Sequence, residues 1–439
     1  MSIFTDVYDH ALGPRSFCVS VASAFAVLVV LLGVAHAQLV VPKEVPTPDS
    51  STRPEPTQTV TPETQASRLP SSENPTLSFS GLIVDVHEHI RDIEDVPRVL
   101  AAMDAVGISK TCLMGSSLFT LTLTPNAGFT KTDENNEELM KIREQYPGRF
   151  EVWPTMDPLD PRKLERFQAL VQRGAQGLKL YLGHGYVVKE TGKYMYHTMA
   201  MDDPRMIPVY RYCSSNFVPI VLHLQPDRKL GPGFLEEFIA VLTEFPAMKI
   251  VCPHFILSSK SPKRLQELLN TFPNLHSDVS FGHDNFLIPG LKRISENPER
   301  FRELFARYPT RFMFSADLVV TDETVKTQAW IETRFQAYLD MLTKQTYTTS
   351  LVPGETLNGL HLSTDLLERI CYKNFDDFIA LKPNNTTPKK TVDWDTLGGP
   401  PANRKPGQTL PASYAGLDSR PAPAAEVLPL NAETLKGTR

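Results

Sequence analysis

The chain has few cysteines, no excess of basic residues and no nucleotide-binding glycine motif. Its 439 residues include 5 cysteines, which show no paired framework, so buried thiols are expected rather than a disulfide scaffold. The formal net charge of -5 argues against a large basic surface for nucleic acid. No Gly-x-Gly-x-x-Gly follows the first predicted strand, which argues against a dinucleotide site. With 41% hydrophobic and 22% charged residues, the composition is that of a globular protein.

The first 37 residues predict export. Ser16 to Val34 form an almost uncharged run rich in Val, Leu and Ala, and Ala35-His36-Ala37 is the small-x-small pattern of a signal-peptidase site. Residues 1–37 are therefore predicted to be a cleaved signal peptide or, because the run is just long enough to span a bilayer, a retained membrane anchor. A buried helix is the third alternative. Both leading interpretations place the protein in the periplasm or outside the cell, with membrane contact only through an anchor.

Two flanking segments are predicted to be disordered. Residues 38–79 are dense in Pro, Ser, Thr and Glu and have few large apolar side chains, so they cannot bury enough surface to offset chain entropy. Residues 383–439 form a similar Pro-rich tail. The globular domain is therefore expected within residues 80–382.

Within residues 80–382, short apolar segments alternate with amphipathic helical stretches. The candidate strands are Leu82–His87, Ser109–Met114, Phe150–Thr155, Gly177–Tyr181, Pro219–Leu224, Lys249–Cys252, Leu275–Ser280 and Arg311–Ser315. Four predicted helices end in an aromatic residue followed by proline, at Tyr146-Pro147, Phe245-Pro246, Phe272-Pro273 and Tyr308-Pro309. Such a recurrence indicates one βα unit used repeatedly. Eight candidate strands that alternate with helical stretches predict an α/β fold, a (β/α)8 TIM barrel, rather than an open doubly wound sheet.

The first strand carries the clearest chemical signal. The apolar run Leu82–Ile90 contains Asp85-x-His87-x-His89. Because side chains alternate along a strand, we expect all three polar residues on one face. Two imidazoles at this spacing can hold one divalent ion.

Other predicted strands also end in single ionisable residues, which is where a βα barrel places its functional groups. These residues are Lys179, His223, His254 and Asp317. Each has an ordinary structural explanation, since Lys179 can extend to solvent and Asp317 can cap a turn. Their joint occurrence in barrel order favours a shared site.

This order of motifs resembles the amidohydrolase superfamily. It looks closest to the amidohydrolase-related (amidohydrolase 2) branch that includes aminocarboxymuconate semialdehyde decarboxylase. The motifs are Asp85-Val86-His87-Glu88-His89, Gly177-Leu178-Lys179-Leu180-Tyr181, the histidines at 223 and 254, Asp317, and Tyr372-Lys373-Asn374-Phe375. The resemblance spans roughly Leu82 to Leu381.

The resemblance implies a divalent metal, usually zinc, held by His87, His89, His223 and Asp317. His254 then binds a second metal or contacts the substrate. Lys179 either bridges two metals or has another task in a site with one metal, which is the favoured count. Asp85 is expected to support the ligands through a hydrogen bond rather than to bind metal.

Catalysis would follow from the ligand set. The metal would lower the pKa of a bound water, and Asp317 would accept a proton from that water as the general base. His254 is the second candidate catalytic residue. Arg91, Tyr181 and His184 are candidates for substrate contact, although a surface salt bridge explains Arg91 equally well.

Three functions are weighed. The first is an exported metal-dependent hydrolase that cleaves a C–N or ester/lactone bond of a small molecule through a metal-activated water. The second is a metal-dependent decarboxylase (a lyase) with the same site, and the third is an exported binding protein that has lost catalysis. A small-molecule substrate is the expected partner, nucleic acid is not, and a homo-oligomer is compatible with the sequence.

Overall fold

The structure of the protein is a computed structural model that describes residues 82–122, 129–181, 185–187, 194–196, 199–224, 234–383 and 391–397. All of them lie in Glu73–Arg439, one of the two units into which the chain divides. The expected signal or anchor, the linker at 38–79 and His184 lie outside the described residues. Within the described ranges, no helix is long and apolar enough to cross a membrane.

Eight parallel strands form a closed ring. They are β1 (Ile83–Ile90), β2 (Ile108–Met114), β3 (Phe150–Trp153), β4 (Leu178–Tyr181), β7 (Ile220–His223), β8 (Ile250–Cys252), β9 (Leu275–Asp278) and β10 (Phe312–Met313). Two sheets, ordered β1-β2-β3 and β10-β9-β8-β7-β4, account for the ladders. A parallel bridge between Thr155 and Lys179 joins β3 to β4, and the Val86 N–H donates to the Phe314 carbonyl at 3.0 Å across the remaining gap. The predicted α/β fold with a parallel barrel is therefore confirmed.

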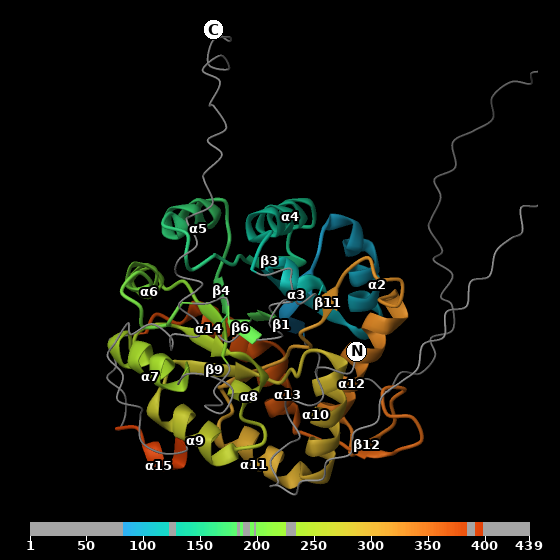
Figure 1. Ribbon diagram of the computed structural model, residues 1–439. Helices are drawn as coiled ribbons and strands as arrows, with labels where there is room; N and C mark the ends of the chain where they lie inside the picture. Colours follow the sequence, from blue (N-terminus) through green and yellow to red (C-terminus); the bar gives the residue numbers. More distant parts are fainter. Residues whose placement is uncertain are drawn as a thin grey trace, which may run out of the picture. The chain divides into compact units, whose positions relative to one another are not determined.

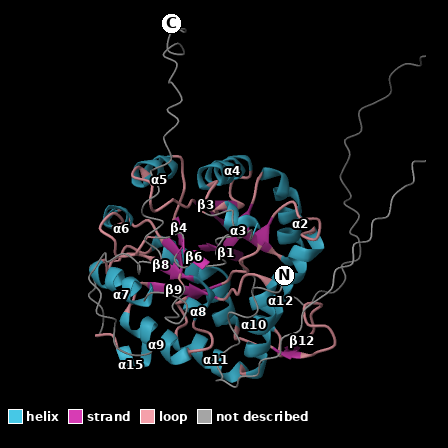
Figure 2. Cartoon of the chain, viewed as in Figure 1, coloured by secondary structure: helices cyan, strands magenta, loops and turns pink. Residues whose placement is uncertain are grey.

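Helices surround the strands, as Figures 1 and 2 show. The surrounding helices are α2 (Val96–Val106), α4 (Thr132–Gln145), α5 (Lys163–Gln172), α6 (Ile207–Ser215), α7 (Phe234–Glu244), α9 (Pro262–Thr271), α10 (Asp284–Glu296), α11 (Pro298–Arg307) and α12 (Gln328–Thr343). Helices α4, α7, α9 and α11 each end at the residue before the aromatic of an aromatic-proline pair. The proline stops each helix because it cannot follow a helical residue without a clash.

Shorter elements decorate the ends of the barrel. These are η1 (Ile93–Asp95), α3 (Leu118–Thr122), β5 (Gly185–Val187), β6 (Tyr194–Tyr196), α8 (Pro253–Leu257), β11 (Val319–Val320), β12 (Thr346–Tyr347), β13 (Leu357–Asn358), α13 (Thr364–Glu368), η3 (Arg369–Lys373), α14 (Asn374–Ala380) and α15 (Trp394–Leu397). Strand β11 continues the eighth strand and pairs in parallel with β1. The eighth strand is therefore interrupted between Met313 and Val319, and this interruption carries Asp317.

The interior of the barrel toward the N-terminal ends of the strands is filled with apolar side chains. One buried cluster joins inward residues of most strands to two phenylalanines of α14: Val84, Val86, Cys112, Met114, Trp153, Val221, Val251, Met313, Phe375 and Phe378. Helix α14 thereby closes the N-terminal end of the barrel. The Asn374 side-chain amide fixes this helix by donating to the carbonyls of Pro309 at 2.9 Å and Phe312 at 2.7 Å.

A bulge in β1 changes which side chains of this strand share a face. Asp85 pairs with Thr111 and Glu88 pairs with Leu113, so three residues of β1 span two residues of β2. Since Thr111 and Leu113 face the same way, Asp85 and Glu88 share a face. The expectation that Asp85 faces with the two histidines is therefore wrong, because the bulge shifts the alternation.

One described segment of the C-terminal flank, residues 391–397, is folded, contrary to expectation. The prediction of disorder from 383 onward is wrong for residues 391–397, which end in α15. Leu397 is buried, and the Asp393 backbone N–H donates to Glu267 Oε1 of α9 at 2.8 Å. A short apolar segment capped by Asp393 is enough to dock onto the barrel.

Candidate metal centre

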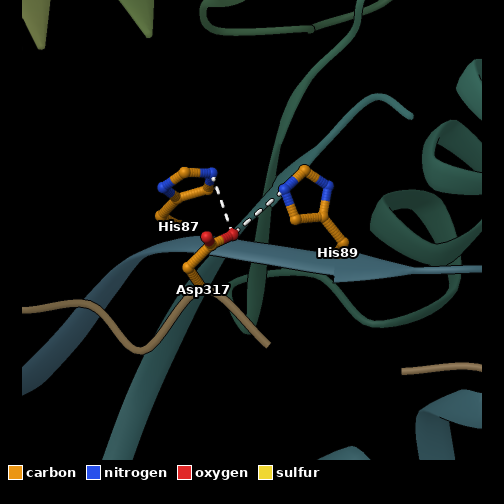
Figure 3. Close-up of side chains that lie close together, drawn as sticks. All are labelled: His87, His89 and Asp317. Atoms are coloured by element: carbon orange, nitrogen blue, oxygen red, sulfur yellow. Dashed lines mark ion pairs between the residues drawn. The ribbon is translucent and has the colours of Figure 1, made fainter. Parts of the chain in front are cut away.

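Three of the predicted ligands meet at the C-terminal end of the barrel. His87 Nε2 and His89 Nε2 of β1 each lie 3.2 Å from the same oxygen, Asp317 Oδ1. Figure 3 shows both imidazoles directed at the Asp317 carboxylate. The ligand atoms of these three residues all lie within 4.8 Å of one another, so together they form a candidate metal site.

The tautomer of His87 follows from its partners. Lys179 Nζ lies 2.8 Å from His87 Nε2, and an ammonium group can only donate, so Nε2 accepts. The ring proton is therefore on Nδ1, which donates to Asp278 Oδ2 at 3.1 Å. Burial lowers the pKa of His87 to about 4, so the ring is neutral at neutral pH.

His89 is held in the same tautomer by Ser116. The Ser116 hydroxyl donates to the Met114 carbonyl at 3.0 Å, so its oxygen accepts from His89 Nδ1 at 2.8 Å. The Nε2 lone pair is left facing Asp317. Burial lowers the pKa of His89 as well, which favours the neutral ring.

The convergence of these groups fits a cation. The His89 Nε2 lone pair and Asp317 Oδ1 are both acceptors, and the His87 Nε2 lone pair beside them has the Lys179 ammonium as its donor, so these acceptors cannot satisfy one another. The neighbouring histidines, acting against burial, hold the pKa of Asp317 well below its ordinary value, so the carboxylate stays ionised. Neutral imidazoles with a carboxylate are the ligands that zinc and related divalent ions prefer.

His254 approaches the other oxygen of the same carboxylate. Its Nε2 lies 3.3 Å from Asp317 Oδ2, and its Nδ1 lies 2.8 Å from Ser280 Oγ. Because the Ser280 hydroxyl donates to Asp278 Oδ1 at 2.7 Å, Ser280 Oγ accepts the proton on His254 Nδ1. Asp317 therefore lies between the β1 histidine pair and His254.

A left-handed turn aims His254 into the site. Residues 254–257, within α8, have φ angles between +46° and +60°, a conformation that costs about 1–2 kcal/mol per non-glycine residue. Side chains of β9 hold the turn: His254 N–H donates to Asp278 at 2.8 Å and Ile256 N–H to Ser277 Oγ at 3.1 Å. Phe255 is fully buried among other phenylalanines, which offsets part of the strain.

Gly282 brings backbone close to the carboxylate. Its φ is +73°, and a Cβ at this position would lie 2.7 Å from Asp317 Oδ2 and 3.8 Å from His254 Cε1. Only glycine leaves the space beside Asp317 open.

The remaining predicted residues lie at different distances from this centre. His223, at the end of β7, contacts the His254 ring with centroids 5.4 Å apart but is not a member of the compact three-residue group. Lys179 is fully buried against His87, and burial lowers its pKa to about 8. Tyr181 is buried, donates to the Gly115 carbonyl at 2.7 Å, and has its ring centroid 4.9 Å from Lys179 Nζ.

Arg91 does not point into the site. It forms ion pairs with Asp92 at 2.6 Å, with Asp95 at 3.8 Å and with Asp322. This geometry matches the salt-bridge alternative rather than a free guanidinium for a substrate carboxylate.

Asp85 supports the site from the other face of β1. Its Oδ1 accepts from the His87 backbone N–H at 3.2 Å. Burial raises the pKa of Asp85 to about 7, and burial together with Asp85 raises the pKa of Glu88 well above its ordinary value. Glu88 Oε2 accepts from the Leu318 N–H at 2.9 Å and so fixes the chain next to Asp317.

Sequence reasoning missed three residues that orient the histidines: Asp278, Ser116 and Ser280. Burial alone would raise the pKa of Asp278, but the hydrogen bond from His87 and the neighbouring His254 lower it to about 2. Asp278 ends β9, but this strand reads Leu275-His276-Ser277-Asp278 and is not apolar, so the signal that marked the other residues was absent. The two serines carry no signal of their own, because serine is common at strand ends and turns.

The sequence matches a known protein family. The family model described as Amidohydrolase matches residues 123–374, which is more than half of the 439-residue chain. The protein therefore belongs to the amidohydrolase family, and it is an enzyme of a superfamily whose members depend on metal ions. The match includes His223, His254 and Asp317 and begins after β1.

Solved structures resemble this chain at low sequence identity. An uncharacterised TIM-barrel protein of Bordetella bronchiseptica is 15% identical over 68% of this chain and 98% of its own, with a TM-score of 0.44. 5-carboxyvanillate decarboxylase LigW of Sphingomonas paucimobilis is 12% identical over 68% of this chain and 99% of its own, with a TM-score of 0.42. 2,6-dihydroxybenzoate decarboxylase of Rhizobium is 16% identical over 68% of this chain and 98% of its own, with a TM-score of 0.40. No curated protein sequence matches this chain. At these identities and TM-scores, none of the likenesses carries a functional conclusion.

Proposed function

We propose that this protein is a metal-dependent hydrolase that cleaves a C–N or ester/lactone bond of a small molecule. The observation that carries the proposal is the convergence of His87 Nε2, His89 Nε2 and Asp317 Oδ1. A divalent metal, most simply one zinc ion, would be held by these three atoms, with His223 as the next candidate ligand. When bound, such an ion supplies a Lewis acid that polarises a carbonyl and lowers the pKa of water.

Asp317 has the geometry of a general base. Its Oδ1 faces the β1 histidines while its Oδ2 faces His254 Nε2 at 3.3 Å. One carboxylate can therefore bind through one oxygen and accept a proton from water through the other, then pass it to the leaving group. His254, held by Ser280, is placed to contact the substrate on that side.

Lys179 favours decarboxylation as the second candidate. Its ammonium group is fully buried and lies 2.8 Å from His87 Nε2, so a cation is already present beside the candidate metal site. A positive charge there can bind a substrate carboxylate or stabilise charge that develops as carbon dioxide leaves.

A substrate panel separates these functions. Zinc-loaded protein is incubated with small amides, lactones, esters and carboxylated compounds, and the products are analysed for hydrolysis and for carbon dioxide. Hydrolysis that Asp317→Asn reduces at least about a hundredfold, with Asp203→Asn as a matched control, supports the first candidate. Carbon dioxide release without hydrolysis supports the second, and no turnover by metal-loaded protein contradicts both.

We also propose that the protein is exported. The support is the uncharged run Ser16–Val34 followed by Ala35-His36-Ala37. N-terminal sequencing of the natural protein is expected to begin at Gln38, or to find an intact N-terminus in a membrane fraction. A natural protein that begins at Met1 or Ser2 and fractionates with the cytosol contradicts export.

A further inference from the structure

We propose that Asp278 is a positioning residue that sets the tautomers of His87 and His254 together, so that both Nε2 atoms face Asp317. The inference deepens the proposed function, because it concerns how the chain prepares the same metal site. Asp278 lies at the end of β9, between the two histidines, and is fully buried.

One oxygen of Asp278 serves His87. Oδ2 accepts from His87 Nδ1 at 3.1 Å, which keeps the ring proton on Nδ1 and the lone pair on Nε2. A carboxylate that orients a metal-binding histidine in this way fixes the ring and strengthens it as a ligand.

The other oxygen serves His254. Oδ1 accepts from the His254 backbone N–H at 2.8 Å, from the Ser280 N–H at 3.1 Å and from the Ser280 hydroxyl at 2.7 Å. Because the hydroxyl proton is directed to Asp278, Ser280 Oγ can only accept from His254 Nδ1. Asp278 therefore sets the His254 tautomer through Ser280 and holds the start of the left-handed turn.

Asparagine at position 278 separates a positioning role from a packing role. It has the shape of aspartate, and its single carbonyl oxygen can still accept the three hydrogen bonds that Oδ1 receives. Its NH2 group then faces His87 Nδ1 and can only donate. The His87 proton is then expected on Nε2, where Asp317 Oδ1 can accept it and from which the Lys179 ammonium must turn away, and the Nε2 lone pair is lost.

The experiment compares the wild-type chain, Asp278→Asn and Asp203→Asn in metal-free form. Asp203 is a buried aspartate that pairs with Arg205 and makes no contact with His87, so it controls for the loss of a buried charge. Two-dimensional 1H–15N spectra of the imidazole rings report the tautomers, with each ring assigned by its His→Gln variant. Competition with a chromophoric chelator reports the dissociation constant for Zn2+.

The wild type and Asp203→Asn are expected to show the Nδ1–H form of His87, and Asp278→Asn the Nε2–H form. Zinc affinity is expected to fall roughly 10- to 100-fold in Asp278→Asn, as for other residues that orient metal-binding histidines. An unchanged His87 tautomer in folded Asp278→Asn, or zinc affinity within about twofold of the wild type, overturns the proposal.

Two further readouts keep the test decisive. If Asp278→Asn does not fold, Ser280→Ala is used: His254 is expected to lose its preference for one tautomer while His87 keeps its own, and an unchanged His254 spectrum overturns the proposal. If the wild type binds no metal, the proposed function fails, yet the metal-free tautomer spectra still decide the role of Asp278.

Discussion

The two ends of the barrel bury polar side chains in different ways. At the C-terminal end, the His87 side chain contacts the side chains of both Asp278 and Asp317. At the N-terminal end, cationic side chains that are buried or half-buried donate to backbone carbonyls instead: Lys249 Nζ to Ile379 at 2.9 Å and Arg311 Nε to Leu275 at 2.7 Å. In these N-terminal contacts a donor meets an acceptor, and the Arg311 Nη2 group also donates to the Phe272 and Leu275 carbonyls.

Two histidines make the difference concrete. Burial lowers the pKa of His87 to about 4 and that of His276 to about 3, so a depressed pKa does not distinguish the two ends. His276 Nδ1 lies 3.2 Å from the Asn274 carbonyl, and its ring packs on Phe378. His87 Nε2 instead lies 2.8 Å from Lys179 Nζ and 3.2 Å from Asp317 Oδ1, within a cluster of ionisable side chains. The surplus of acceptors, rather than the burial of a titratable group, identifies the functional end.

The largest expected difference between the ends is in metal binding. His87→Ala is expected to lower zinc affinity at least about 100-fold, because it removes a ligand rather than a group that orients one. His276→Ala, at the other end, is expected to lower the melting temperature without changing zinc affinity. Chelator competition and thermal unfolding of both variants check this, and equal zinc affinity in the two variants would remove the distinction.

Asn374 tests the N-terminal end by itself. Asn374→Ala leaves the buried carbonyls of Pro309 and Phe312 without their donor and is expected to lower the free energy of unfolding by roughly 2–3 kcal/mol. Zinc affinity of the folded fraction is expected to stay unchanged. Urea unfolding measures the loss, and a change in stability below about 0.5 kcal/mol would show that this amide does not hold α14 in place.

Acid sensitivity is expected to depend in part on His276. Its pKa of about 3 in the folded chain lies below the ordinary 6.5, so between these values the unfolded chain binds more protons. The stability that His276 contributes is therefore complete above pH 6.5 and is lost as the pH falls toward 3. His276→Gln should flatten the decline in unfolding free energy over this range by on the order of 1–3 kcal/mol. Parallel pH curves for the wild type and the variant would contradict this.

The smallest expected effects come from two glycines. Gly282→Ala and Gly107→Ala each place a Cβ at a positive φ and should each cost about 1 kcal/mol of stability. Only the Gly282 variant meets Asp317, so only that variant should also lose zinc affinity, by about threefold to tenfold. Matched zinc affinities in the two variants would show that Asp317 can yield to the new methyl group.

The sequence predicts the site residues that are ionisable and follow an apolar strand. His87, His89, Lys179, His254 and Asp317 lie near or just after the C-terminal ends of predicted apolar strands. In the structure the three histidines lie around the Asp317 carboxylate, and Lys179 contacts His87. Strand alternation fails at Asp85, because a bulge depends on the pairing of β1 with β2 and leaves no local signal.

Other features depend on tertiary contacts that a pattern does not contain. The left-handed turn at 254–257 contains no glycine, and side chains of β9 enforce it. The docking of residues 391–397 relies on a partner, α9, that is distant in the sequence. For the same reason, the pattern could not separate His223 from the three residues that meet most closely.

The central claim is that the acceptors at the C-terminal end of the barrel hold a metal ion. Anomalous diffraction at the zinc edge from crystals of zinc-loaded protein tests it most directly. We predict a single strong peak about 2.0–2.2 Å from His87 Nε2, His89 Nε2 and Asp317 Oδ1. Zinc-soaked crystals with no peak among these three atoms, or with a peak only elsewhere, would contradict the claim.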